Sequence, residues 1–215
     1  GMNYYDGSLR ARQNISQQGG EQIRGESIYD NEGRAAVSII PAPLNSTGLQ
    51  YIENLNLNPS RESYSRSDFE GKAIAGKLSD TSGSSKYYSS NNDVFNQEHR
   101  DLIPDAQGYP LSISEYERST LGRISKQKGV GKLYQENKEN QSQYYYGSTN
   151  DFELKRLFGS NAGKAIYYRK VMSKDPNGQI SVKYLDGSDK VIAEALAGAP
   201  PSNLTRLDNI RNDSV

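Results

Sequence analysis

Alternating apolar and polar positions predict short β-strands through most of the chain. In the clearest case, residues 21–29 lead into a polar turn and residues 34–40 leave it, with Ala35, Val37 and Ile39 at every second position. Period-two alternation places such side chains on one face of a strand. The pattern therefore predicts a β-hairpin over residues 21–40.

Turns of the form Asp-x-x-Gly recur between the strand-like segments. In such a turn the Asp carboxylate can accept the backbone N–H two residues on, the middle pair forms a type I turn, and the Gly takes a left-handed conformation. A turn of this kind closes a hairpin with a bulge. The turn residues are Asp30 with Gly33, Asp105 with Gly108, and Asp175 with Gly178.

The last third of the chain predicts a three-stranded meander. Residues 165–172, 179–184 and 190–193 have the composition of strands, and short polar turns separate them. Together with the first hairpin they predict a mainly β fold, in which antiparallel hairpins and a meander form an open or spiral sheet.

One short helix is expected to cover a face of this sheet. Ser148, Thr149 or Asn150 can cap its N-terminus, and Gly159 can end it. Its apolar positions are Phe152, Leu154, Leu157 and Phe158.

Long loops are expected between the first and second Asp-x-x-Gly turns. The low-complexity stretch 79–86 lies there, and its Gly83 is expected to tolerate alanine. From residue 198 onward a polar sequence with two prolines predicts a tail or linker, residues 198–215. The predicted division is a β domain over 1–197, with the hairpin 21–40, a loop-rich insertion 41–100, and hairpins and a helix over 103–197.

The composition favours a folded sheet with a thin core. Leu, Ile, Val and Phe make up about 19% of the chain, which is near the level of disordered proteins, but 26 basic residues balance 26 acidic ones. The 16 Tyr against 4 Phe suit half-exposed pleated surfaces, where a ring packs and its hydroxyl stays hydrated.

Charge and cysteine content exclude several classes of function. Zero net charge without a long basic run gives no general attraction to nucleic acid or anionic lipid. The absence of Cys excludes disulfides, thiolate catalysis and Cys-based zinc sites. There is no long apolar run to insert into a membrane.

Tyr29 precedes the Asp30 turn and Arg34 follows its Gly33, which gives the pattern Tyr-Asp-x-x-Gly-Arg. This pattern resembles the core of the YD repeats of RHS-type proteins, Tc-toxin cocoons and teneurin shells. Weaker copies start at Tyr5, Tyr116 and Tyr184, and the segments 103–110 and 144–147 are similar to the region before the repeat core in large exported Bacteroidetes RHS-like proteins.

The resemblance implies a non-catalytic structural shell or scaffold segment of a secreted or cell-surface protein. In that family the shell performs no chemistry, and toxic or adhesive activity belongs to appended domains. The implied partners are the remaining domains of a larger parent protein. Gly1 before Met2 is typical of cloning, so a signal peptide is expected outside this chain.

Open sheet edges at the two ends of such a segment also predict a weak homodimer.

Few residues offer catalytic or cofactor chemistry. His99 is the single histidine and lies in a polar stretch, which favours a solvated loop residue over a base or a metal ligand. The segment 129–132, Gly-Val-Gly-Lys, lacks the full spacing of a phosphate-binding loop and is interpreted as a turn. No catalytic, cofactor-binding or metal-binding residue is therefore predicted.

Clustered tyrosines supply the alternative function. Alternation along a strand favours packing, but an exposed aromatic platform would suit a carbohydrate- or protein-binding surface module. The residues of this candidate platform are Tyr87, Tyr88, Tyr144, Tyr145 and Tyr146.

Overall fold

The protein is a mainly β antiparallel meander in which ten strands follow one another in the sheet in chain order. The computed structural model describes residues 1–18, 21–44, 48–93 and 100–198. The sheet is not closed, which confirms the predicted fold class. Two compact units divide the chain: the first holds Gly1–Tyr145 with Ser173–Gly178, and the second holds Tyr146–Met172 and the residues from Gln179 onward.

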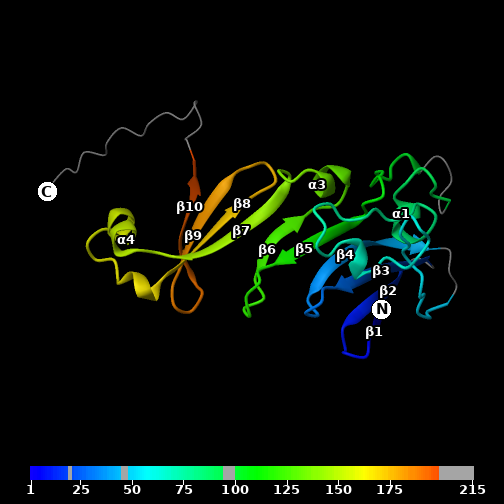
Figure 1. Cartoon of the computed structure of the whole chain (residues 1–215), viewed down its shortest axis with the longest axis horizontal. Helices are drawn as coiled ribbons and strands as arrows, with labels where there is room; N and C mark the ends of the chain where they lie inside the picture. Colours follow the sequence, from blue (N-terminus) through cyan, green and yellow to red (C-terminus); the bar gives the residue numbers. More distant parts are fainter. Residues whose placement is uncertain (19–20, 45–47, 94–99, 199–215) are drawn as a thin grey trace. The chain divides into compact units, whose positions relative to one another are not determined.

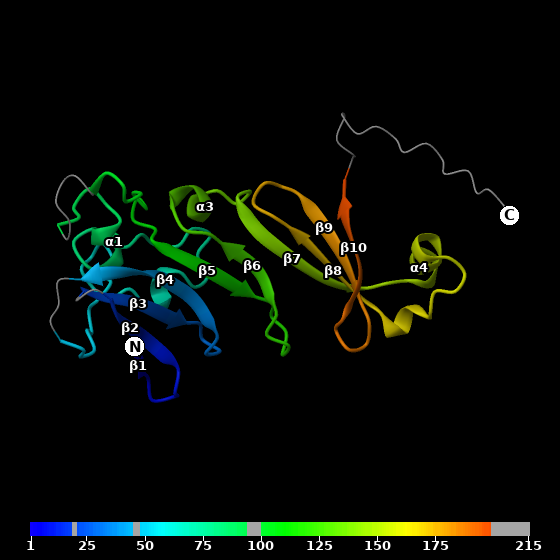
Figure 2. The ribbon, with the colours of Figure 1, turned by 180° about the vertical axis from the view of Figure 1, so that it is seen from behind.

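The first unit contains three consecutive hairpins. Their turns lie at the same end of the strands, and all three point downward in Figures 1 and 2. The strands are β1 (Met2–Tyr5), β2 (Ala11–Gln18), β3 (Glu21–Tyr29), β4 (Ala35–Leu44), β5 (Leu111–Tyr116) and β6 (Ile124–Lys128), and β7 (Gln141–Ser148) pairs with β6.

The predicted hairpin over residues 21–40 is confirmed as β3 and β4. A register shift near Tyr29 changes one detail of the prediction, because Tyr29 pairs with Ala35 whereas Ile28 pairs with Val37. The extra residue is a β-bulge. Ala35 is therefore exposed, while Val37 and Ile39 are buried as predicted and Ala36 is buried with them.

The connection between β4 and β5 covers one face of the sheet. Its described part contains the 3-10 turn Arg66–Asp68 and the helix α1 (Gly83–Tyr87). Its apolar residues complete the core of the unit, which they share with strands β3, β4 and β5. The core residues are Ile28, Ala36, Val37, Ile39, Tyr64, Phe69, Ala75, Leu78, Leu111 and Ile113.

Polar side chains of the sheet also hold this connection by its backbone. The Gln13 amide donates to the Ile52 carbonyl at 2.5 Å and accepts from the Ile52 N–H at 3.2 Å. The buried Arg24 guanidinium donates to the Gln50 carbonyl at 2.7 Å. Burial lowers the pKa of Arg24. These bonds give partners to backbone groups of the connection, which make no ladder hydrogen bonds with the sheet.

The expectation that Gly83 tolerates alanine is wrong. Gly83 starts α1 with φ +54°, and a Cβ there would lie 2.3 Å from the Leu55 carbonyl oxygen and from the Asn56 side-chain oxygen. The Asn56 oxygen accepts the Ser84 N–H at 2.9 Å, which fixes this close approach. The low-complexity stretch 79–86 is thus part of a packed turn and helix rather than a free loop.

The second unit is smaller and has its own helix. The helix α4 (Asp151–Phe158) is confirmed where the capping pattern predicts it: Asn150 is the N-cap, its side chain accepts the Glu153 N–H at 2.8 Å, and Gly159 ends the helix at φ +80°. The unit also holds the 3-10 turn Ala165–Tyr167 and the hairpin of β9 (Ile180–Leu185) and β10 (Val191–Ala197).

The strand predicted over residues 165–172 starts later than expected. Residues 165–167 form the 3-10 turn, and β8 spans Arg169–Lys174. The Ala165 N–H donates to Asp151 at 2.7 Å, which holds the turn against the start of α4. A short five-residue helix, α3 (Lys132–Glu136), follows β6 in the first unit, where the sequence predicted only a turn.

Candidate functional site

The site with the most specific geometry is the hairpin turn at Asp30. Its carboxylate accepts the backbone N–H of Glu32 at 3.0 Å and of Arg34 at 2.8 Å, while Arg34 Nε donates to the second oxygen at 2.7 Å. Gly33 has φ +79°, as the motif predicted, and its N–H donates to the Asp30 carbonyl at 3.1 Å. Each residue of the Asp-x-x-Gly-Arg pattern thus has a defined role.

The same turn recurs at two of the weaker copies. Asp6 accepts the N–H of Ser8 and Arg10, and Asp186 accepts the N–H of Ser188 and Lys190, at 2.8–3.1 Å. The left-handed position is held there by Leu9 at φ +59° and Asp189 at φ +63° instead of Gly. The copy at Tyr116 is longer, and Glu117 binds Arg123 Nε at 2.9 Å across it.

A further copy of the turn lies in the β4–β5 connection, where the sequence does not match the Tyr-Asp-x-x-Gly-Arg motif. Asn58 accepts the N–H of Ser60 at 3.0 Å and of Glu62 at 3.1 Å, and Arg61 takes the left-handed position at φ +64°. An Asx residue followed by Pro59 is a general turn signal, and it was the feature that could have identified this turn.

Arginine hydrogen bonds hold the turn carboxylates in their charged form. The Arg10 side chain lowers the pKa of Asp6. At Asp30 partial burial opposes ionisation, but the backbone and side-chain hydrogen bonds from Arg34 outweigh it and lower the carboxyl pKa. These carboxylates are structural acceptors, and their low pKa makes them poor proton donors near neutral pH.

Successive hairpins are joined by an Arg–Tyr contact, which we call the Arg–Tyr lock. Arg10 of the first turn stacks over the ring of Tyr29 at 5.0 Å, and Arg34 of the second turn stacks over Tyr116 at 4.5 Å. In both cases the Tyr hydroxyl donates to the residue after the arginine, to the Ala11 carbonyl at 2.9 Å and to the Ala35 carbonyl at 2.8 Å. The lock therefore repeats with one geometry.

The lock occupies a place where backbone pairing stops. Between β2 and β3 the ladder starts at Gln13 and runs away from the turns, and between β4 and β5 it covers only Val37–Ile39. Within each hairpin, by contrast, pairing reaches the residue beside the turn. Side chains thus join neighbouring hairpins at the end of the strands that carries the turns, and backbone hydrogen bonds join them further along the strands.

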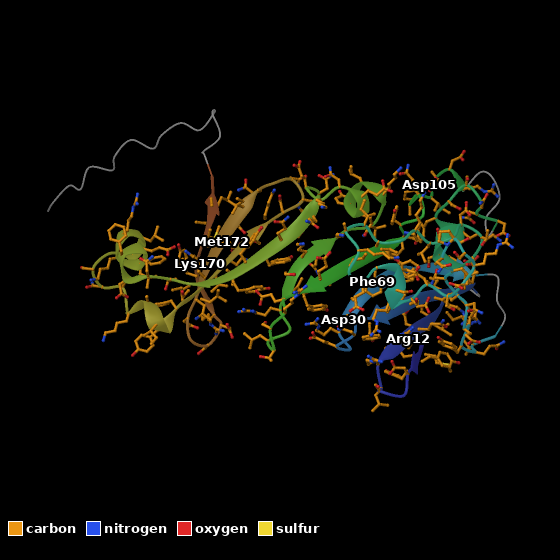
Figure 3. All side chains as sticks on the ribbon, in the orientation of Figure 1. Arg12, Asp30, Phe69, Asp105, Lys170 and Met172 are labelled. Atoms are coloured by element: carbon orange, nitrogen blue, oxygen red, sulfur yellow. The ribbon has the colours of Figure 1, made fainter. Side chains whose placement is uncertain are left out.

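The other two Asp-x-x-Gly turns differ from the first. Asp175 accepts the Asn177 N–H at 2.9 Å, and Gly178 has φ +86°, as expected for the turn between β8 and β9. Asp105 and Gly108 form a turn within the β4–β5 connection, so the hairpin predicted there is wrong. Figure 3 shows Asp105 away from the row of hairpin turns that contains Asp30.

In the first unit, the two parts of the candidate tyrosine platform do not come together. Tyr87 and Tyr88 lie at the end of α1 with their rings edge to face at 4.7 Å, and the Tyr88 hydroxyl donates to the Pro41 carbonyl. Tyr144 and Tyr145 lie on β7, well apart from α1 in both views (Figures 1 and 2). Tyr146 belongs to the second unit.

The expectations for the lone histidine and for metal binding concern different parts of the chain. His99 lies outside the described residues. Within the described ranges no group of three or more His, Cys, Asp or Glu side chains is arranged to hold a metal ion. The helices there are also too short or too polar to cross a bilayer.

A charged groove lies beside the Asp30 turn, with a volume of about 710 Å³. The sheet face forms its floor, and residues 69–75 of the β4–β5 connection form one wall. Asp30 and Phe69, both labelled in Figure 3, are among its lining residues. Its charged residues are Asp30, Glu32, Arg34, Glu70, Lys72, Glu115, Arg118, Lys126, Lys128 and Lys138.

The fold and these turns define an open antiparallel meander built from interlocked hairpins. The chain belongs to the DUF6443 family, a domain of unknown function, whose model matches residues 1–148. No curated protein matches the chain. The matched residues contain the Arg–Tyr locks and the charged groove.

Proposed function

We propose that this chain is a non-catalytic wall segment of a secreted or cell-surface protein of the RHS type. The Arg–Tyr lock is the observation that supports this function most directly. It repeats between hairpins at the positions of the Tyr-Asp-x-x-Gly-Arg motif, so that the turn of one hairpin positions the first strand of the next.

A repeated lock suits a wall because each hairpin depends mainly on its neighbours. Such quasi-one-dimensional assemblies gain stability from the interfaces between successive units. Cation–π contacts between Arg and Tyr contribute about 0.5–1 kcal/mol when exposed and more when shielded from water. A bond from the Tyr hydroxyl to a backbone carbonyl adds about 0.5–1.5 kcal/mol.

The natural partners of such a segment are strands of the same parent protein. The outermost strands in the described part of the sheet are β1 and β10. An outermost strand presents backbone N–H and C=O groups to a further strand. The parent protein would supply these strands, and in isolation a second copy can replace them and form a weak dimer.

Light scattering over a concentration series tests the open edge. We expect concentration-dependent self-association that Val191→Pro reduces, because proline removes a backbone donor from β10. Val191→Thr is the matched control, since it keeps both the N–H and the branched side chain. A strict monomer at high concentration, or a dimer unaffected by proline, would refute the open-edge model.

An activity screen tests the non-catalytic part of the proposal separately. Purified protein should show no turnover on a panel of hydrolase substrates. Activity that disappears in the His99→Ala variant would show that the chain is an enzyme and would overturn this proposal.

A further inference from the structure

The floor of the charged groove carries more positive than negative charge. Lys126 Nζ lies 3.3 Å and Lys128 Nζ lies 3.5 Å from the two oxygens of Glu115, so two ammonium groups share one carboxylate. The Lys128 side chain is only 6% exposed, and its other polar contact is the Ala73 carbonyl at 3.2 Å. A partly desolvated cation without a full counter-charge is unfavourable, and a bound anion would offset that cost.

The rim of the groove adds to this positive field. Lys72, Arg118 and Lys138 line it, and within the described residues none of the three has an acidic partner within 4.0 Å. Of the rim carboxylates, Asp30 and Glu32 share Arg34, and Glu70 binds Arg66 outside the groove, so the lining as a whole still has six basic side chains against four acidic ones. Potentials of one sign in a concave site attract ligands of the opposite charge.

The volume and the lining of the groove favour an organic anion over an inorganic ion or a peptide. A volume of about 710 Å³ is typical of sites for organic ligands and is much larger than a single inorganic ion requires. Peptides usually bind a sheet at a free edge or through apolar pockets. Here the floor is formed by interior strands, and the apolar lining residues Ile113 and Ala75 are buried.

The remaining lining groups suit a hydroxyl-rich ligand. Asn31 and Gln141 contribute amide groups beside the cations. Gln141 pairs with Lys128 across β6 and β7, so its amide lies next to the lysine whose charge is only partly balanced. Cations for carboxylates and amides for hydroxyls together match the chemistry of an acidic sugar.

We propose that the charged groove binds an acidic oligosaccharide, with the uronate carboxylates on Lys126, Lys128 and the rim cations. This goes beyond a wall function and does not depend on it. It also differs from a tyrosine platform, because the recognition is by charge and hydrogen bonding on the sheet face.

Isothermal titration calorimetry with short oligogalacturonates tests this site in the full chain. Lys126→Gln should weaken binding roughly tenfold, as expected for the loss of one charge-assisted contact. Lys183→Gln is the matched control. Lys183 also lies on a strand, is 42% exposed against 45% for Lys126, and lies 3.2 Å from Glu194, but it does not line the groove.

A change of opposite sign separates charge recognition from damage to the fold. Glu115→Gln removes the floor carboxylate, so it should strengthen binding several-fold, whereas general disruption of the site would weaken binding in both variants. Binding should also weaken as salt is raised, because screening shortens the range of the attraction.

Several outcomes would overturn the proposal. One is the absence of heat with oligogalacturonate at any concentration tested. Another is equal binding of a neutral maltooligosaccharide, and a third is tighter binding of an oligoglutamate peptide, which would assign the groove to acidic peptides instead. Equal effects of Lys126→Gln and Lys183→Gln would likewise remove the groove as the binding site.

Discussion

The two units use the same hairpin turn but are stabilised in different ways. In the first unit, ten buried apolar residues form one cluster between the sheet and the β4–β5 connection, and Arg–Tyr locks join the hairpins. In the described part of the second unit, the buried apolar residues are Leu154 and Tyr184. The turn at Asp186 there carries Lys190 in place of arginine.

Polar contacts join α4 to β8 and β9 in the second unit. Glu153 on α4 accepts hydrogen bonds from Lys170 at 2.9 Å and from the Tyr184 hydroxyl at 2.7 Å. Burial, with Glu153 as a second cause, raises the pKa of Tyr184 to about 12. A shared turn thus sets the local backbone, whereas stability depends on what the strands bury and on what joins one hairpin to the next.

The largest effect is expected from the core of the first unit. Leu111→Ala should lower the free energy of unfolding by about 2–5 kcal/mol, since Leu111 is fully buried in the cluster. Leu102→Ala, at an exposed leucine, is the control and should change little. Chemical denaturation measures both.

The core of the second unit allows a sharper form of the same test. Leu154→Ala should increase amide exchange in α4 and β9 while protection of β3 and β4 is kept. Equal loss of protection in both units would contradict separate cores, because it would show that one core supports the whole chain.

The turn residues should have the next largest effects, with opposite signs at equivalent positions. Gly33→Val should cost about 1–3 kcal/mol, because φ is +79° and a Cβ would lie 3.0 Å from Arg10 Nη1. Gly178→Val should behave similarly. Leu9→Gly should instead stabilise by up to about 1 kcal/mol, since it relieves a left-handed leucine at an entropic cost. Gly187→Ala, at a position with open space, is the control, and thermal denaturation compares the four variants.

The Arg–Tyr lock should contribute a smaller amount. Tyr116→Phe should cost about 0.5–1.5 kcal/mol through loss of the bond to the Ala35 carbonyl. A double-mutant cycle of Tyr116→Leu with Arg34→Met should give a coupling energy of about 0.5–1 kcal/mol, because these changes remove the ring and the cation that form the contact. Tyr5→Phe is the control, since Tyr5 is 58% exposed. Strict additivity in the cycle would show that Arg34 and Tyr116 do not act as a lock.

The smallest effect is expected from pH in the second unit. Lys170, followed by Tyr184, lowers the pKa of Glu153 below its ordinary value of 4.5. The stability from this ionised group is therefore present at neutral pH and is lost as the pH falls from about 4.5 through the folded pKa. Glu153→Gln should remove that part of the acid sensitivity, measured by thermal melts at neutral and acidic pH. Glu139→Gln, at an exposed carboxylate, should leave it unchanged.

Local features of the fold could be predicted from the sequence because they depend on neighbouring residues. The Asp30 turn, the positive φ of Gly33 and the Asn150 cap each involve residues within four positions of one another. The Arg–Tyr lock could not be predicted in this way, since 81 residues separate Tyr116 from Ala35. The charged groove was missed for the same reason, because β4, β6 and the connection meet only in the folded chain.

The position of the lock has a consequence for how such chains can grow. The turns of the hairpins β1–β2, β3–β4 and β5–β6 lie at the same end of their strands, whereas β4 and β5 are connected at the opposite end through residues 45–110. A contact between side chains of adjacent hairpins is insensitive to the length of chain that runs between them elsewhere, and closure entropy grows only slowly with that length. The end of the strands that carries the turns therefore fixes the spacing of the hairpins. The opposite end can accept inserted sequence, and in this way a regular scaffold can carry a groove.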